Sequence, residues 1–271
     1  MSKMVYLKTD VEIAVIKANG DLLGRTHAEV AKIIQAGVTT KELDTIADTF
    51  IKDNGGHPSF KGYQVGKLKF PAALCISIND VVVHGIPNSY QLKDGDIVSI
   101  DCGFYKNGFH ADSAYTYGIG NVKPEVQALM RTTKESLFEG ISKAGIGSRV
   151  GDIGYAIQHY CEAKGYTIVR ELVGHGVGKF LHESPEVPNH GKRGDGTKLK
   201  EGMVLAIEPM VNLGKKAIHQ ENDGWTIRTQ DRRPSAHYEH TVAVRKGKAE
   251  ILTTFQYIEE VLANSSEIVF I

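Results

Sequence analysis

The sequence predicts one α+β domain, and three observations support that prediction. A long helical pattern, a shorter helix and a group of strands follow one another, and the same plan returns roughly 108 residues later, where Ala144-Gly145-Ile146 echoes Ala36-Gly37-Val38. The strands are apolar or β-branched runs separated by turn residues. No linker or low-complexity segment divides the chain, so we expect a single, internally duplicated domain over residues 1–271.

The first half predicts two helices and then strands. Apolar residues recur at helical spacing from about Thr9 to Gln35. Thr39 or Thr40 can cap a second helix, which the Asn54-Gly55-Gly56 run ends. Residues 57–70 are typical of a loop, and residues 72–83 predict a strand broken by a turn at Asn79-Asp80.

The most informative stretch is DIVSIDCGFYKNGFHADS, residues 96–113. Its β-forming start and its Asn107-Gly108 pair predict a hairpin with a two-residue turn. That turn sets Asp101 opposite Ala114, so Asp112 becomes the diagonal neighbour of Asp101 on the same face. Two such carboxylates repel each other unless a cation lies between them, and a divalent ion is the obvious candidate. The alternative is a pair of solvated strand carboxylates.

The second half repeats the plan. Pro124 suits the first turn of a helix reaching about Ala144. A strand is expected over 166–172, and two more over 203–208 and 239–244. A shorter helix precedes these strands, and its inward residues are Val150, Ile153, Ile157, Tyr160 and Cys161.

Three further places in this half carry side chains that bind metals. His175 lies in a glycine-rich run, with His182 seven residues later; Glu208 ends an apolar strand, and Glu239 begins another. A buried strand-end glutamate is rare without a partner, although a structural histidine and ion pairs with Lys or Arg are the alternatives. Together with the hairpin aspartates, this set suits two cations about 3.5–4 Å apart. Its oxygen-rich character favours Mn, Fe(II), Co or Zn over Cu.

Composition excludes other classes of protein. Hydrophobic residues make up 41% and charged residues 24%, as in soluble globular proteins. Lys+Arg and Asp+Glu both number 32, so net charge gives no indication of DNA, RNA or an anionic membrane as partner. Three widely spaced cysteines fit a reducing compartment. No apolar run approaches a membrane span and no secretory signal is evident, so we expect a cytoplasmic protein.

Four runs, DCGFYKNGFHADS, GHGVGKFLHESP, GMVLAIEP and YEHT, closely resemble the type I methionine aminopeptidases. The resemblance reaches from the first helix to about Thr254, and the segment CISINDVVVHGIP narrows it to this subfamily. It implies the duplicated pita-bread fold of creatinases and aminopeptidases, with a central antiparallel sheet covered by helices. It also implies an enzyme that removes the initiator methionine from nascent proteins whose second residue is small.

The resemblance assigns the metal ligands residue by residue. Asp101 would bind one divalent ion and Asp112 and Glu239 would bridge, while His175 and Glu208 would hold the second ion. The two ions would activate a bridging hydroxide that attacks the methionyl carbonyl.

Three side chains receive roles in the reaction. Glu208 is the expected base for the proton of the attacking water. His182 is expected to stabilise the developing oxyanion, and His84 to contact the scissile amide nitrogen or the next residue. The free substrate amine can ligate a metal, which would restrict cleavage to the terminal bond.

The methionine pocket is expected to be small and apolar, because a thioether packs well against aromatic rings. The matching positions are Phe70, Cys75, Leu181 and Trp225, although Leu181 replaces an aromatic residue found in many relatives. The segment 60–69 is longer than in the shortest relatives. Cys75 could instead be plain core, and Trp225 could line the entrance.

Some relatives bind a structural Na or K ion at positions that match Asn79, Val81 and Ser235. Nascent polypeptides and Met-peptides are the implied substrates, with the ribosome as a candidate partner, and a monomer is expected. The tail, residues 264–271, is expected to be an added strand or a packing arm.

Three other functions remain as alternatives. A Xaa-Pro dipeptidase or creatinase-like enzyme would share fold and ligands, but usually carries an additional N-terminal domain. A non-catalytic protein that docks on ribosomes or RNA would be expected to lose metal ligands, and all five are present. A two-cation metallophosphatase would also use Asp, His and Glu clusters, but none of its motifs is found.

Overall fold

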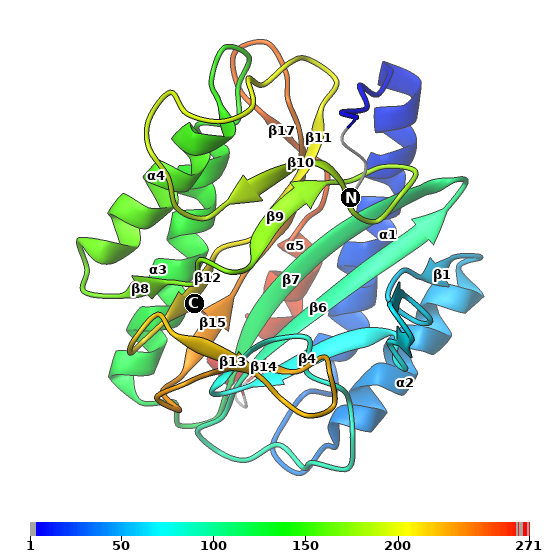
Figure 1. The fold of residues 1–271 in the computed structure, drawn as a ribbon. Helices are drawn as coiled ribbons and strands as arrows, with labels where there is room; N and C mark the ends of the chain where they lie inside the picture. Colours follow the sequence, from blue (N-terminus) through cyan, green and yellow to red (C-terminus); the bar gives the residue numbers. More distant parts are fainter. Residues whose placement is uncertain (1–3, 264, 266–267, 270) are drawn as a thin grey trace.

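The computed structural model describes residues 4–263, 265, 268–269 and 271. Figure 1 shows two helix pairs flanking a centre made of strands, with the long β6–β7 hairpin running diagonally across the molecule. The helices are α1 (Asp10–Ala31), α2 (Thr40–Asp53), α3 (Pro124–Ile141), α4 (Val150–Glu162) and the short α5 (Gln256–Leu262).

Two five-stranded antiparallel sheets form the centre; apart from β18, which comes from the C-terminal end, the first is built from the first half of the chain and the second from the second half. The first contains β1 (His57–Pro58), β4 (Leu74–Ile78), β6 (Ile97–Lys106), β7 (Phe109–Ile119) and β18 (Ile268–Val269). The second contains β9 (Val173–Gly176), β10 (Glu183–Pro188), β11 (Val204–Ile207), β16 (His240–Ala243) and β17 (Glu250–Ile251).

Smaller sheets complete the described part of the chain. One joins β8 (Thr167–Ile168), β12 (Met210–Asn212) and β15 (Ser235–His237), and another joins β5 (Val81–Val83), β13 (Ile218–Gln220) and β14 (Ile227–Thr229). A separate hairpin pairs β2 (Gln64–Val65) with β3 (Leu68–Lys69).

Hydrogen bonds join the two halves where β7 passes beside β16. The backbone N–H of Glu239 donates to the carbonyl of Ala114 at 2.9 Å, and that of Asp112 donates to Thr241 Oγ1 at 3.0 Å. Both contacts involve or adjoin residues expected to bind metal. The site therefore forms where the duplicated halves meet.

Most expected elements are confirmed, and the α+β class, with antiparallel sheets covered by helices, is confirmed with them. Thr39, not Thr40, caps α2, through a capping box with Glu42. Pro124 does begin α3. The tail adds an edge strand to the first sheet, because β18 pairs with β7; residues 264, 266–267 and 270 lie outside the described residues.

Three expectations about boundaries were wrong. The first helix ends at Ala31 instead of Gln35, and the strand expected over 166–172 is reduced to Thr167–Ile168. Residues 57–70 are not simply a loop, since they contain β1 and the β2–β3 hairpin. Short strands of this kind leave too few alternating residues to be read from a sequence.

Candidate active site

The β6–β7 hairpin places two aspartates side by side. Asn107 and Gly108 form the turn with φ of 54° and 84°, as a type I′ turn requires. Asp101 pairs with Ala114 and Asp112 pairs with Gly103, so the two carboxylates are diagonal neighbours on one face, as predicted. Asp112 is buried, at 3% exposure.

Three strands of the second half bring further ligands to the same face. His175 lies on β9, Glu208 directly follows β11, and Glu239 directly precedes β16. His175 Nε2 lies 3.5 Å from Glu208 Oε1 and 3.9 Å from Asp112 Oδ2. Possible ligand atoms of Asp112, His175 and Glu239 all lie within 4.8 Å of one another.

The imidazole of His175 is oriented by its neighbour. Its Nδ1 lies 2.9 Å from the carbonyl oxygen of Gly176, and a carbonyl can only accept. Nδ1 must therefore carry the proton, which leaves the lone pair of Nε2 directed at the carboxylates. That is the arrangement of a histidine that ligates a metal.

Buried oxygens of the carboxylates are left without partners. Among the described residues, Asp101 Oδ1, Asp112 Oδ1 and Glu239 Oε1 have no hydrogen-bond partner. Burial raises the pKa of Asp101 and of Glu208 to about 7. Burial, with the neighbouring carboxylates, also raises the pKa of Asp112 and of Glu239 well above the usual values. Unpaired buried carboxylate oxygens lie beside the imidazole of His175, and Asp112, His175 and Glu239 form the tightest group, so the donor set fits divalent cations.

Thr241 fixes the position of Asp112. Its Oγ1 accepts from the Asp112 N–H at 3.0 Å and donates to the Asp112 carbonyl at 2.8 Å. His237 is a second supporting residue, since its Nε2 lies 3.6 Å from Glu208 Oε2. Sequence reasoning missed both residues, although each is two positions from Glu239 and therefore on the same side of the extended chain.

An apolar pocket opens beside the carboxylates. Its core is a cluster of five buried residues: Phe60, Phe70, Ala72, Cys75 and Leu181. Tyr63, Ile86 and Trp225 are partly buried and pack against this cluster. Phe70 and Trp225 meet edge to face with ring centroids 5.3 Å apart. Sequence reasoning missed Phe60 and Tyr63, which lie at the start of the 60–69 segment.

One cavity of about 330 Å³ is lined by the acidic cluster and the apolar pocket together. Every residue expected to bind a divalent metal, act in catalysis or contact methionine lines it: Phe70, Cys75, His84, Asp101, Asp112, His175, Leu181, His182, Glu208, Trp225 and Glu239. Val65 of the β2–β3 hairpin also lines this cavity. The 60–69 segment therefore contributes to its wall.

Two histidines, His84 and His182, also line the cavity. The His182 ring lies 4.3 Å from His175 and 4.9 Å from Tyr63, measured between centroids. Burial, reinforced by the neighbouring His175, lowers the pKa of His182 to about 2, and burial lowers the pKa of His84 to about 4. Both rings are therefore neutral near pH 7. His84 also has a φ of 59°, which is uncommon outside glycine and marks a constrained position.

The three positions matched to a monovalent ion lie outside the carboxylate cluster. The N–H of Ser235 donates to the carbonyl of Asn79 at 2.9 Å, which holds β15 beside the turn. The Asn79 side chain is engaged with Asp96 and with the N–H of Ile97. Val81 begins β5 two residues further on.

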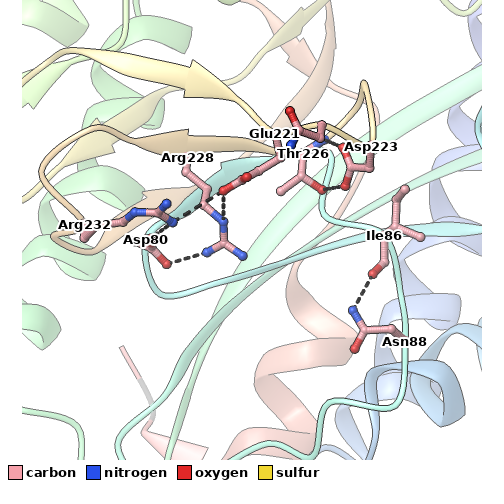
Figure 2. A pocket seen from close by; sticks show the side chains of 9 residues that line it. Asp80, Ile86, Asn88, Glu221, Asp223, Thr226, Arg228 and Arg232 are labelled. Carbon is pink, nitrogen blue, oxygen red and sulfur yellow. Dashed lines mark hydrogen bonds and ion pairs between the residues drawn. The ribbon is translucent and has the colours of Figure 1, made fainter.

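A wider cavity, of about 770 Å³, also contains acidic side chains (Figure 2). There, however, Asp80 accepts from Arg228 at 2.7 Å and from Arg232 at 3.2 Å, and Glu221 lies 2.8 Å from Arg228 Nε. Each of these carboxylates has a guanidinium partner. Asp80 and Glu221 thus form a neutral ion-pair network with the two arginines. The third carboxylate that lines this cavity, Asp223, accepts from the N–H groups of Trp225 and Thr226 and from the Thr226 hydroxyl. These carboxylate oxygens are engaged with protein donors, unlike those of the acidic cluster.

Comparison with known proteins agrees with this geometry. The sequence model of metallopeptidase family M24 matches residues 14–246. A methionine aminopeptidase from Clostridium perfringens is 52% identical over 250 residues, which is 92% of this chain and 99% of that protein.

Solved structures confirm the expected pita-bread fold. The crystal structure of methionine aminopeptidase from Rickettsia prowazekii superposes with a TM-score of 0.90 at 37% identity, over 93% of this chain and all of that one. A prolidase from Pyrococcus furiosus shares the fold at a TM-score of 0.73 and 21% identity, over 92% of this chain and 65% of that one. None of the helices in the described residues is long and apolar enough to span a membrane.

Proposed function

This chain belongs to metallopeptidase family M24, among its methionine aminopeptidases, and we propose that it removes the N-terminal methionine from nascent proteins and Met-peptides whose second residue is small. The observation that best supports the proposal is the shared cavity. Five potential metal ligands line it on one side, and an apolar pocket suited to a thioether lines the other.

We assign the metal ligands as the resemblance implies. Asp101, Asp112, His175, Glu208 and Glu239 would hold the divalent ions, with Asp101 toward one ion, His175 and Glu208 toward the other, and Asp112 and Glu239 shared between them. Two ions drawn from Co, Mn, Fe(II) and Zn suit these oxygen and imidazole donors. When bound, such ions polarise a carbonyl and lower the pKa of water.

The side chains of the chain itself then have distinct tasks. The Glu208 carboxylate, 3.5 Å from His175 Nε2, takes up the proton of the attacking water. His182 is neutral and donates an N–H to the oxygen on which negative charge develops. His84 contacts the scissile amide nitrogen or the residue after it.

The apolar pocket selects methionine. Phe70 and Trp225 present ring edges and faces to the thioether, and Cys75 and Leu181 close the wall. Leucine at 181 leaves more room than the aromatic residue that many relatives carry there.

We further propose a single catalytic domain over residues 1–271 that acts as a cytoplasmic monomer, with the ribosome as a candidate partner. The three cysteines are free and buried, which fits a reducing compartment. A structural Na or K ion at Asn79, Val81 and Ser235 is part of the same proposal.

Peptide hydrolysis tests the proposed function. Metal-stripped protein refilled with Mn or Co would be given Met-Ala-Ser, Met-Lys-Ser, Ala-Pro and other Xaa-Pro peptides. We expect metal-dependent release of methionine from Met-Ala-Ser, and far slower release from Met-Lys-Ser. Cleavage of Xaa-Pro peptides instead would move the protein to the sister peptidases, and no cleavage would support a binding role.

A further inference from the structure

We propose that Lys8, in the arm that precedes α1, is a positioning residue for His182. Lys8 lies outside residues 14–246, the stretch matched by the family model. The inference rests on the proposed function, in which His182 meets the developing negative charge. Lys8 itself touches neither the substrate nor the expected metal ligands. It acts on His182 through Glu183.

A buried ion pair links the arm to the His182 loop. Lys8 Nζ lies 2.5 Å from Glu183 Oε2, and the two side chains are only 4% and 1% exposed. For comparison, Lys17 lies within α1 and pairs with Glu250, and these two side chains are 57% and 33% exposed. A buried charge without its partner is strongly unfavourable, so Glu183 keeps its buried place only while Lys8 neutralises it.

Glu183 in turn shapes the turn that carries His182. Its second oxygen, Oε1, accepts from the backbone N–H of Phe180 at 3.1 Å. The backbone at Gly178 approaches so closely that an added Cβ would lie 2.5 Å from Lys8 Cε and 2.6 Å from Glu183 Oε1. Residues 178–183 therefore pack around the Glu183 carboxylate, and His182 directly precedes Glu183 in this turn.

The same glutamate also connects His182 to the histidine of the acidic cluster. Glu183 pairs with Gly176 where β10 meets β9, directly after His175. The rings of His175 and His182 consequently meet edge to face, with centroids 4.3 Å apart. A shift of Glu183 would move His182 relative to His175.

The arm itself is fixed independently of the Lys8 charge. The Lys8 N–H donates to the carbonyl of Gly202 at 2.7 Å, and Val5 forms an isolated parallel bridge with Ser184. Thr9, next in the chain, caps α1 through a capping box. Replacing the ammonium group should therefore release Glu183 without detaching the arm.

The test uses metal-loaded protein, with Lys8→Met to remove the charge, Lys8→Arg to restore it and Lys17→Met as the matched control. We expect Lys8→Met to lower kcat on Met-Ala-Ser between about 10-fold and 100-fold, since small misplacements of catalytic groups cost that much. KM and bound metal should stay near wild type. Lys8→Arg should recover most of the activity, and Lys17→Met should lose none.

A double-variant cycle separates positioning from simple stabilisation. In a His182→Ala background, adding Lys8→Met should lower kcat by less than about 2-fold, because residues that act through one another are not additive. An undiminished further loss would overturn the proposal, as would wild-type kcat in Lys8→Met alone. Lys8→Met combined with Glu183→Gln removes both charges and serves if the single variant does not fold. That neutral pair should fold but still show lowered kcat, and wild-type kcat there would also overturn the proposal.

Hydrogen exchange provides a readout that does not depend on catalysis. Amides of residues 178–184 should exchange faster in Lys8→Met than in wild type or Lys17→Met, with or without metal. Unchanged exchange would contradict the positioning role even if activity fell. If wild-type protein releases no methionine, the proposed function fails, whereas the exchange result still decides whether Lys8 orders the loop.

Discussion

Two groups of acidic side chains in this molecule look alike in the sequence and differ completely in their surroundings. In the ion-pair cavity of Figure 2, Asp80 and Glu221 both contact Arg228. In the candidate metal centre, buried oxygens of Asp101, Asp112 and Glu239 find no hydrogen-bond partner in the part of the chain that the structure describes. The comparison shows that charge compensation, more than the number of carboxylates, identifies a metal site.

Electrostatics explains why the difference matters. A carboxylate near the surface is stabilised by water and by its arginine partner. Such ion pairs contribute little to the free energy of unfolding. A cluster of buried carboxylates cannot all ionise unless a cation is supplied. The raised pKa values of the second group are therefore the sign of a place reserved for metal.

The largest effect is expected from removing a bridging carboxylate. Asp112→Asn or Glu239→Gln should abolish turnover, because each removes a negative oxygen that two cations would share. Metal content, measured by elemental analysis, should fall in parallel. Near-normal activity in a variant shown to contain metal would disprove the two-metal assignment.

His182→Ala should have the next largest effect. Loss of a donor to a developing oxyanion costs about 10²–10³ in kcat. Metal content should be unchanged, because His182 is not among the proposed ligands. An unchanged kcat would remove His182 from the chemistry.

A third prediction concerns pH. Burial raises the pKa of Asp101 and Glu208 to about 7, far above values in an unfolded chain. Stability from raised carboxyl pKa values is present at low pH and is lost as pH rises toward 7. The Tm of the metal-free protein should therefore fall as the pH is raised from 5 to 7.5.

Added Mn should raise Tm more at the upper end of that range, because fewer protons then compete for the carboxylates. Thermal unfolding with and without chelator measures both effects. A metal-induced Tm gain that is larger at pH 5 than at pH 7.5 would be inconsistent with this explanation.

The apolar side of the cavity should show a smaller effect. Phe70→Ala removes an edge-to-face contact with Trp225, and aromatic pairs of this type contribute about 0.5–1.5 kcal/mol. We expect KM for Met-Ala-Ser to rise by about tenfold, with kcat reduced much less. If kcat falls and KM does not, Phe70 acts in the reaction and not in methionine binding.

The smallest effect is expected in the ion-pair cavity. Glu221→Gln weakens a partly exposed pair with Arg228, so its cost in unfolding free energy should be below about 1 kcal/mol. Metal content and kcat should equal those of wild type. Loss of bound metal in this variant would break the distinction between the two acidic groups.

The sequence could predict the catalytic hairpin because its information is local. Asn107-Gly108 fixes the register, and the register alone makes Asp101 and Asp112 diagonal neighbours. The strand-end glutamates were visible for a related reason, since a carboxylate next to an apolar run needs a partner. Periodicity, however, does not predict which strands lie next to one another. That arrangement was implied only by the family resemblance.

Other parts could not be read because their signals depend on tertiary contacts. The β2–β3 hairpin has two residues in each strand, too few for a period to appear. His237 and Thr241 support the site through contacts across sheets, Glu208 for one and Asp112 for the other. The Lys8–Glu183 pair joins residues 175 positions apart, so only the fold shows it.

An anomalous difference map at the Mn edge would test the metal centre most directly. For crystals grown with Mn, we expect two peaks about 3.5–4 Å apart between Asp112, Glu239 and the flanking ligands. No peak should lie beside Asp80 or Glu221. A single peak in the ion-pair cavity, with none at the bridging carboxylates, would contradict the account.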